Sequence, residues 1–178
     1  LFAMKYLTTV CLTACLCVAL SLTHAQTVYR VNNTAGSDAD FTDLQTAISG
    51  VVAGDVLIIE HSNTPYNVAE VEIDIQLEIY GTGFFLLDNP GLQADTRSAK
   101  LGPINITAAS VEISGFEMEE VRINGNGVVF ERNLVNGNLV IGDTNPAVKS
   151  VEIKRSYLKS SDNIILDIKE GSSHVISN

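Results

Sequence analysis

The sequence predicts an all-β fold, a parallel β-solenoid with one short capping helix at its N-terminal end. A short strand pattern returns along the chain, at residues 111–113 (Val-Glu-Ile), 128–130 (Val-Val-Phe) and 151–153 (Val-Glu-Ile). Polar residues and a Gly or Asn turn follow each copy. Short strands that recur without helices between them are typical of stacked coils.

The first 25 residues are predicted to be a cleaved secretory signal. Lys5 precedes an apolar run over residues 6–22, and small residues lead to Ala25, where a signal peptidase would cut. A membrane anchor is a weaker alternative, because the run is near the lower limit of ~17 residues for a span and no basic flank follows it. Lipoprotein processing at Cys15 is another, since residues 12–15 have the form of a lipobox. We expect a protein that is secreted or displayed on the outer cell surface.

Composition limits the partners of the chain. All three cysteines precede Ala25, so the segment that follows would form no disulfides, and its stability must come from a packed core and backbone ladders. The net charge of −10 argues against nucleic acid or an anionic membrane surface as a partner. We expect a monomer without a transmembrane segment after cleavage.

The capping helix is predicted from Thr42 to Val52. Thr42 followed by Gln45 has the form of a capping box, and Leu44 and Ile48 fall on one face at helical spacing. Because this amphipathic helix needs a partner for its apolar face, we expect it to cover the open end of the solenoid.

Strands are predicted over most of the remaining chain. Residues 56–59 form an apolar, β-branched run, and residues 71–79 alternate apolar and polar side chains with the period of a strand. A second apolar strand follows the later copies of the pattern, at residues 121–123, 139–141 and 164–166. One central apolar residue marks each coil: Ile58, Ile79, Ile113, Phe130, Ile153 and Val175.

The spacing of these markers is uneven. The longest interval, from Ile79 to Ile113, contains a polar, turn-rich segment at residues 88–102, which we predict to be an inserted loop. The shortest, from Ile113 to Phe130, has no explanation from the sequence alone. An antiparallel sandwich would also give short strands and Gly or Asn turns, but it gives no reason for similar residues to recur at equivalent positions. Stacking of successive coils supplies that reason.

The succession of elements in the first half resembles a known fold. The helix, residues 54–59, Tyr66 and the strand that ends at residues 78–81 (Glu-Ile-Tyr-Gly) follow one another as at the start of right-handed parallel β-helix proteins of the pectin-lyase-like group. Residues 77–86 and 94–99 are similar to segments of uncharacterised secreted bacterial β-helix proteins. The resemblance implies a right-handed parallel β-helix, a fold that many enzymes and non-enzymes share.

The domain is expected to start at residue 26 and to run through residue 178. Residues 175–178 repeat the strand pattern, so we expect an N-terminal fragment of a longer protein. The resemblance also implies that such proteins often end in a sorting domain for surface display.

The candidate site residues are Arg132, Lys154 and Arg155. Arg132 and Arg155 take the same coil position, and Glu131 and Lys154 the position before it. Lyases of the pectin-lyase-like group, as the resemblance implies, hold an acidic sugar through Ca²⁺ bound by carboxylates and remove a proton with Arg or Lys. The three basic residues could therefore bind sugar carboxylates. Their plain interpretation is a ladder of surface ion pairs, each contributing ~0–1 kcal/mol.

Other chemistry has less support in the sequence. No two Asp residues recur at one coil position, so no metal site is predicted, and Ca²⁺ would be a cofactor only if the protein is a lyase. Hydrolases of this fold use paired Asp residues, but Asp162 and Asp167 are spaced to face opposite sides of a strand. His61 and His174 are isolated in the sequence and are expected to be solvated.

Two functions from different classes follow. The first is a non-catalytic, secreted or surface-displayed β-helix that binds a glycan through one long face. The alternative is a polysaccharide lyase or glycoside hydrolase whose active site lies partly outside this sequence, with Arg132 or Arg155 contacting the substrate.

Overall fold

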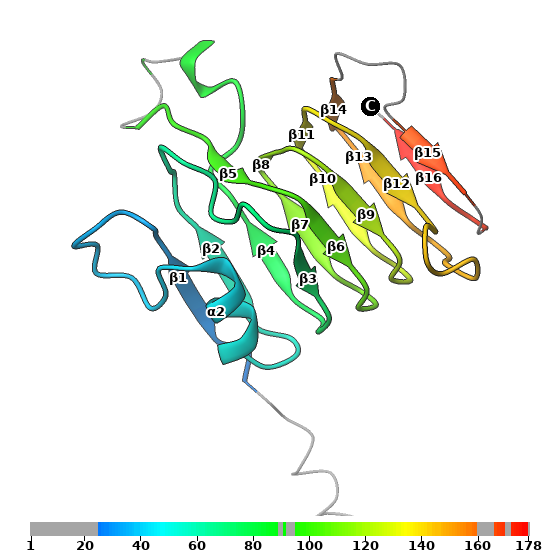
Figure 1. The fold of residues 1–178 in the computed structure, drawn as a ribbon, viewed down its shortest axis with the longest axis horizontal. Coiled ribbons are helices and arrows are strands. Elements are labelled where there is room, and N and C mark those ends of the chain that lie inside the picture. The colour runs from blue at the N-terminus through cyan, green and yellow to red at the C-terminus, as the bar shows by residue number, and fades with distance from the viewer. Residues whose placement is uncertain (1–24, 89–90, 92–94, 160–165, 170–171, 178) are drawn as a thin grey trace, which may run out of the picture.

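A computed structural model describes residues 25–88, 91, 95–159, 166–169 and 172–177 of the chain. The predicted signal segment, apart from its last residue, lies outside these residues. In the described part of the chain, no helix has the length and apolar character needed to cross a membrane. Within the described residues, one α-helix, α2 (Leu44–Gly50), and one short 3₁₀ helix, η1 (Leu86–Asp88), accompany sixteen β-strands (Figure 1).

The strands form three parallel sheets. In spatial order, sheet A contains β1 (Val28–Val31), β2 (Val56–Ile59), β4 (Glu78–Tyr80), β7 (Glu112–Ser114), β10 (Val129–Glu131), β13 (Glu152–Lys154) and β16 (Val175–Ser177). Sheet B contains β3 (Val71–Ile73), β6 (Ile104–Ile106), β9 (Val121–Ile123), β12 (Leu139–Ile141) and β15 (Leu166–Ile168). Sheet C contains β5 (Ala99–Leu101), β8 (Phe116–Met118), β11 (Leu134–Val135) and β14 (Tyr157–Leu158).

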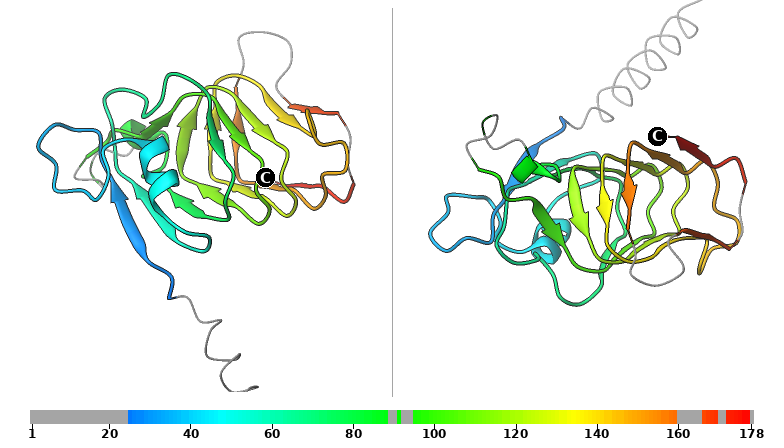
Figure 2. Two further views of the ribbon diagram at one scale, coloured as in Figure 1. Left: turned by 60° about the horizontal axis from the view of Figure 1, so that its bottom comes forward. Right: turned by 90° about the horizontal axis from the view of Figure 1, so that it is seen from above.

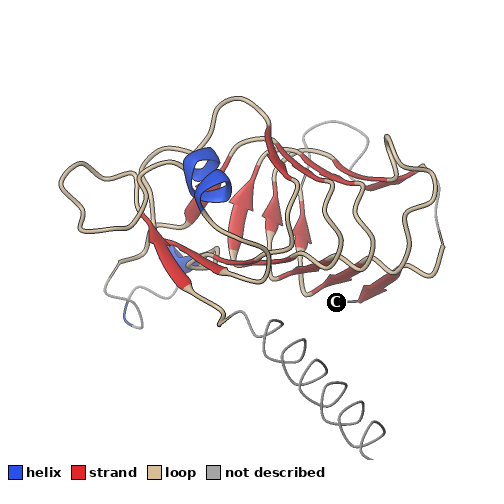
Figure 3. Cartoon of the chain, turned by 90° about the horizontal axis from the view of Figure 1, so that it is seen from below, coloured by secondary structure: helices blue, strands red, loops and turns tan. Residues whose placement is uncertain are grey.

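From β4 onward the chain visits sheets A, C and B in turn and then returns to sheet A. Each round places its strands beside those of the round before, so the coils stack along one axis (Figures 2 and 3). The all-β class and the parallel stacking are confirmed, and the arrangement is compatible with a solenoid. The antiparallel sandwich is wrong, because the named strands pair in parallel.

Stacked apolar side chains between the sheets form the core. In sheet A, Ile79, Ile113, Phe130 and Ile153 are in register and buried, as their role as coil markers predicted. The marker at Ile58 is wrong by one residue: Leu57 pairs with Ile79 and is fully buried, whereas Ile58 is only partly buried. The marker at Val175 is wrong in the same way, because Ile176 pairs with Ile153.

Residues 71–79 form two strands rather than one. β3 lies in sheet B and β4 in sheet A, and the chain bends between them. Leu77 in the bend is as fully buried as Ile79 in the strand. The alternation of buried and exposed side chains therefore continues through the bend between β3 and β4. For this reason the sequence pattern identifies the core residues but does not reveal the bend.

A third strand per coil, in sheet C, was missed. β8, β11 and β14 have two or three residues each, and a tight turn separates each from the preceding strand of sheet A. The short interval from Ile113 to Phe130 is thus a coil with three strands and short turns. The predicted second strands are present as β9 and β12, while β15 begins at Leu166, and residues 164–165 lie outside the described residues.

The helix begins later than predicted. Asp43, not Thr42, is the N-cap, because its side chain accepts a hydrogen bond from the Thr46 amide at 2.8 Å. Leu44, Ala47 and Ile48 are buried in the same core as the strands, and α2 lies at the end of the stack that β1 and β2 form (Figure 3). The predicted covering role is consistent with this position.

The turn from sheet A to sheet C repeats from coil to coil. Gly115, Arg132 and Arg155 all have positive φ there, at 86°, 52° and 46°. The next residue in the second of these turns, Asn133, is fully buried. Its side chain accepts a hydrogen bond from the Phe116 amide and donates one to the Ile113 carbonyl, each 3.0 Å long. Asn133 thereby ties its coil to the one before it.

Replacement of Ile113 by Asp should unfold the domain. The side chain is fully buried, and an unpaired charge there would cost a large part of the ~5–15 kcal/mol that stabilises a typical domain. Urea unfolding followed by far-UV circular dichroism would measure this. Ser114→Asp places the same charge on the outer face of β7 and is the matched control; equal midpoints for the two variants would contradict the inward ladder.

Replacement of Asn133 by Ala should lower the free energy of unfolding by about 2–4 kcal/mol. The change leaves the buried Phe116 amide without this acceptor and removes one donor from the Ile113 carbonyl, and it also opens space in the core. An unsatisfied buried group alone costs roughly 1–3 kcal/mol. The exposed Asn136→Ala variant, three residues further along the same coil, should lose less than about 1 kcal/mol. A loss for Asn133→Ala no larger than for Asn136→Ala would show that the buried amide does not hold the coils.

Candidate functional site

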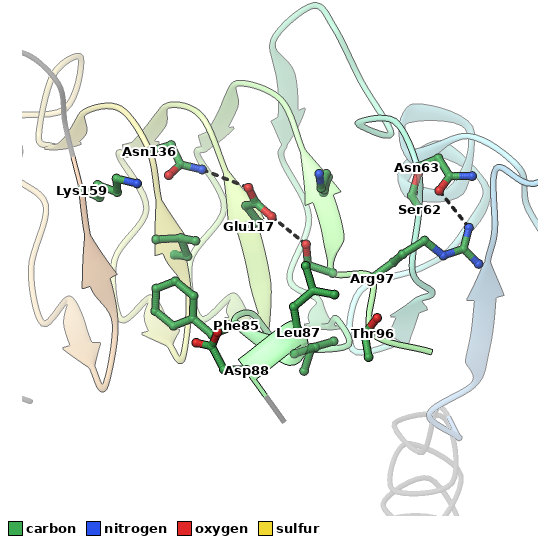
Figure 4. Close-up of a pocket in the computed structure, with 14 residues that line it drawn as sticks. Ser62, Asn63, Phe85, Leu87, Asp88, Thr96, Arg97, Glu117, Asn136 and Lys159 are labelled. Atoms are coloured by element: carbon green, nitrogen blue, oxygen red, sulfur yellow. Dashed lines mark hydrogen bonds between the residues drawn. The ribbon is translucent and has the colours of Figure 1, made fainter. Parts of the chain in front are cut away.

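The outer face of sheet C carries a groove. Its cavity has a volume of about 420 Å³ and lies between the sheet and the segment that connects β4 to β5. Figure 4 shows a row of polar side chains across the strands, formed by Lys159, Asn136, Glu117, Arg97 and Asn63, with Phe85, Leu87, Asp88 and Thr96 along one side. We call this the sheet C groove.

Sheet C places Lys100, Glu117 and Leu134 on the groove floor. Lys100 pairs with Glu117, Glu117 with Leu134, and Leu134 with Tyr157, so these four residues form an outward ladder over β5, β8, β11 and β14. Adjacent strands lie about 4.8 Å apart, which spaces these side chains evenly along the stack. The floor is polar toward β5 and apolar toward β14.

Glu117 is fixed by hydrogen bonds from both sides. Its carboxylate accepts a bond from the Ser98 hydroxyl at 2.6 Å and from the Asn136 amide at 3.2 Å. Lys100 and Lys159 also line the groove, and within the described part of the chain their ammonium groups have no hydrogen-bond or ion-pair partner. The groove therefore offers a held acceptor and two free donors to a ligand.

Hydrogen bonds join the two ends of the segment that connects β4 to β5. The Thr82 hydroxyl donates to the Arg97 carbonyl at 3.3 Å and accepts from the Ala99 amide at 2.9 Å. The predicted loop at residues 88–102 is therefore real but its bounds are wrong at both ends. The chain leaves β4 at Gly81, and residues 99–101 already form β5. Residues 89–90 and 92–94 lie outside the described part.

A cluster of charged side chains holds the far end of this segment. The Arg97 guanidinium donates three bonds to the carboxylate of Asp95, at 2.6, 3.0 and 3.2 Å, and a fourth to the Asn63 side chain at 3.0 Å. The Arg97 hydrogen bonds keep the pKa of Asp95 well below its usual range, and the same contact raises the pKa of Arg97. His61 is not isolated as predicted, because its Nε2 lies 3.0 Å from Asp95.

A second hollow lies at the corner between sheets A and C. It has a volume of about 440 Å³ and is lined by Tyr80, Gly81, Thr82, Gly83, Phe84, Ser114, Gly115 and Arg132. Burial and a hydrogen bond to Glu78 raise the pKa of Tyr80, so this phenol stays protonated. Phe84 lines this hollow and Phe85 the sheet C groove, so the two rings stand between the cavities.

The three predicted site residues lie together on one strip, as their alignment required. Glu131 pairs in register with Lys154, and Arg132 and Arg155 follow at the turn. The Glu131 carboxylate forms ion pairs with both arginines, at 3.5 Å from Arg132 and 2.5 Å from Arg155. Lys154 forms its ion pair with Glu152 rather than with Glu131. Both arginines are more than half exposed, at 63% and 58%. Arg132 also lines the corner hollow.

The remaining sequence candidates form no joint site in the described residues. Asp162 lies outside them, and Asp167 forms an ion pair with Lys169 at 2.5 Å. His174 accepts a hydrogen bond from the Val151 amide at 3.3 Å. No group of three metal-binding side chains is found in the part of the chain that the structure describes.

The sequence analysis missed the groove itself. Glu117, Asn136 and Ser98 come from different strands and turns, and sheet C was not predicted, so nothing placed them on one face. The usable signal was the recurrence of a polar residue two or three positions after each turn, at Glu117, Asn136 and Lys159. Comparison with protein-family models, with curated proteins and with solved structures finds no match for this chain.

Replacement of Arg97 by Gln should raise the pKa of Asp95 toward the ordinary value of about 3.9. Because the folded pKa lies below the unfolded one, the carboxylate stabilises the attached loop at and above about pH 4, and this contribution fades as the pH falls further. NMR titration of the Asp95 carboxyl carbon measures the midpoint. Lys100→Gln, which removes a nearby charge without a contact to Asp95, should leave it unchanged. Equal midpoints in wild type and Arg97→Gln would contradict the assignment.

Proposed function

We propose that this chain belongs to a secreted or surface-displayed protein that binds a glycan without catalysis, through the sheet C groove. We propose further that the coils form a right-handed parallel β-helix of the pectin-lyase-like kind. The signal-like N-terminal segment and the acidic composition support export, and the parallel, three-sided coil supports the fold.

The observation that carries the proposal is the make-up of the groove. It combines a fixed carboxylate, an exposed amide, two lysines and an apolar edge in one cavity about 420 Å³ in volume. Hydroxyl groups of a sugar both donate and accept hydrogen bonds, so they match a floor that presents both kinds of partner. Pockets that combine apolar walls with a few placed polar groups are the usual form of small-ligand sites.

The solenoid suits a polymeric ligand. Glu117 and Asn136 come from consecutive coils, and the same face continues to Lys159 on the next. A chain of sugars laid along the stack can therefore meet one coil after another at intervals of about 4.8 Å, with Glu117, Leu134 and Tyr157 at one coil position and Asn136 and Lys159 two residues further along. Affinity then accumulates from several weak contacts, which is how an exposed, open groove can bind.

The alternative, a polysaccharide lyase or hydrolase, has one observation in its favour. Arg132 lines the corner hollow beside Tyr80, where it could meet a sugar carboxylate, and Arg155 and Lys154 extend that strip. A lyase of this kind would use Ca²⁺ as cofactor. Turnover of a polysaccharide at an ordinary enzymatic rate, abolished by an Arg132→Ala, Arg155→Ala double variant, would favour this function over binding alone.

Isothermal titration calorimetry with cellohexaose and hexagalacturonate would test the binding proposal. The wild-type chain should bind at least one of the two. A Glu117→Gln, Asn136→Ala double variant should bind at least about tenfold more weakly, because two hydrogen bonds of ~0.5–1.5 kcal/mol each are lost from the groove.

The matched control is Glu72→Gln, which removes a carboxylate from the exposed face of sheet B and should bind as wild type. If the Glu117→Gln, Asn136→Ala variant binds with the affinity of the wild type, the sugar binds elsewhere on the protein. Absence of binding to both sugars would contradict the proposed function.

A further inference from the structure

We propose that Phe85 and Tyr157 form a stacking platform at the edge of the sheet C groove, for the pyranose rings of a neutral glycan with equatorial hydroxyl groups. This inference rests on the proposed glycan-binding function. It specifies the class of glycan and the side chains that would contact it.

Two aromatic rings meet on the groove rim although both remain open to solvent. Phe85 and Tyr157 have ring centroids 5.5 Å apart and an interplanar angle of 70°. Phe84 supports Phe85 from the other side, at 5.0 Å and 72°. Phe85 is 49% exposed and Tyr157 is 50% exposed. Edge-to-face contact fixes the rings against each other while leaving aromatic surface uncovered.

The backbone at Phe85 is held in an unfavourable conformation. Its φ of 55° lies in the left-handed region, which strains a bulky residue but not glycine. The first turn of η1 follows at once, with the Asp88 amide bonded to the Phe85 carbonyl at 3.1 Å. Burial offsets this strain only in part, because about half of Phe85 is exposed to water. Strained residues of this type gather where a side chain must be presented to a ligand.

The charges around the platform favour a neutral partner. The groove lining contains Lys100 and Lys159, and also Asp88 and Glu117, so its unpaired positive charge is balanced; the further cation, Arg97, is neutralised by Asp95. No single-sign field is left to select an anionic chain. Recognition must then come from ring stacking and hydroxyl contacts.

The shape of the floor agrees with this chemistry. Leu134 lies between Glu117 and Tyr157 in the outward ladder, so the polar floor passes into an apolar strip that leads to the rim. A hexopyranose with equatorial hydroxyl groups has axial C–H bonds on both faces and hydroxyls around its edge. One such ring can therefore lie on Phe85 or Tyr157 while its edge, or that of the next sugar, reaches Glu117 and Asn136. Successive sugars of an equatorially linked glucan are spaced similarly to successive strands.

Phe85→Trp would test the platform directly, since the chain contains no tryptophan. Cellohexaose should shift the fluorescence emission of this single indole, and Phe85→Trp should keep the affinity of the wild type. Val68→Trp is the control, because Val68 is 92% exposed and lies outside the groove lining; its emission should not change.

Phe85→Gly would remove the ring without threatening the fold, because glycine adopts a φ of 55° without strain. Calorimetry should give at least about tenfold weaker binding of cellohexaose, with a thermal midpoint equal to or above that of the wild type. Tyr157→Ser should weaken binding in the same direction. The wild type should prefer cellohexaose to hexagalacturonate.

The failures of the two proposals are distinguishable. Unchanged affinity of Phe85→Gly, together with weaker binding by the Glu117→Gln, Asn136→Ala variant, would overturn the platform and leave the glycan-binding groove in place. Preference for hexagalacturonate would overturn the neutral ligand class. No binding of either sugar by the wild type would remove both proposals.

Discussion

The in-register stacking of inward side chains, coil upon coil, is the constraint on which the rest of the structure depends. Side chains alternate between core and solvent, so a slip of one residue in a strand would turn its core residues outward. Ile79, Ile113, Phe130 and Ile153 define the register in sheet A, and parallel hydrogen bonding transmits it to the corners. Asn133 then fixes one corner from inside the core. The register therefore determines which outward side chains lie next to one another on the surface.

The groove is a consequence of that constraint. Since the inward positions carry the core, the outward positions and the corners are free to vary, and a long segment can be inserted between β4 and β5 without disturbing the ladder. Thr82 closes the base of the insertion, and Asp95 and Arg97 hold its far end against Asn63. What the insertion adds is a wall beside sheet C, and with it a cavity above a row of polar side chains.

Much of the fold could be predicted from the sequence, because the repeat of apolar residues directly reports the stacking. The capping helix, the strands of sheet A from β2 onward and the alignment of Glu131 with Lys154 were all predicted, whereas β1 was missed. The strands of sheet C were not, since their residues, Phe-Glu-Met in β8, Leu-Val in β11 and Tyr-Leu in β14, repeat no common pattern. Single-residue errors at Ile58 and Val175 arose where neighbouring positions are equally apolar. The groove could not be predicted from the sequence, because Glu117 and Asn136 meet there a loop whose path is defined only in the folded chain.

Backbone amide chemical-shift mapping during titration with cellohexaose would test most directly whether the sheet C groove is the binding face. The changes are expected to concentrate on β5, β8 and β11 and on the residues around Phe85 and Tyr157, with sheets A and B unaffected along their outer faces. Changes centred on sheet B or on the corner hollow at Arg132, or a spectrum that does not respond, would contradict the assignment of function to this groove.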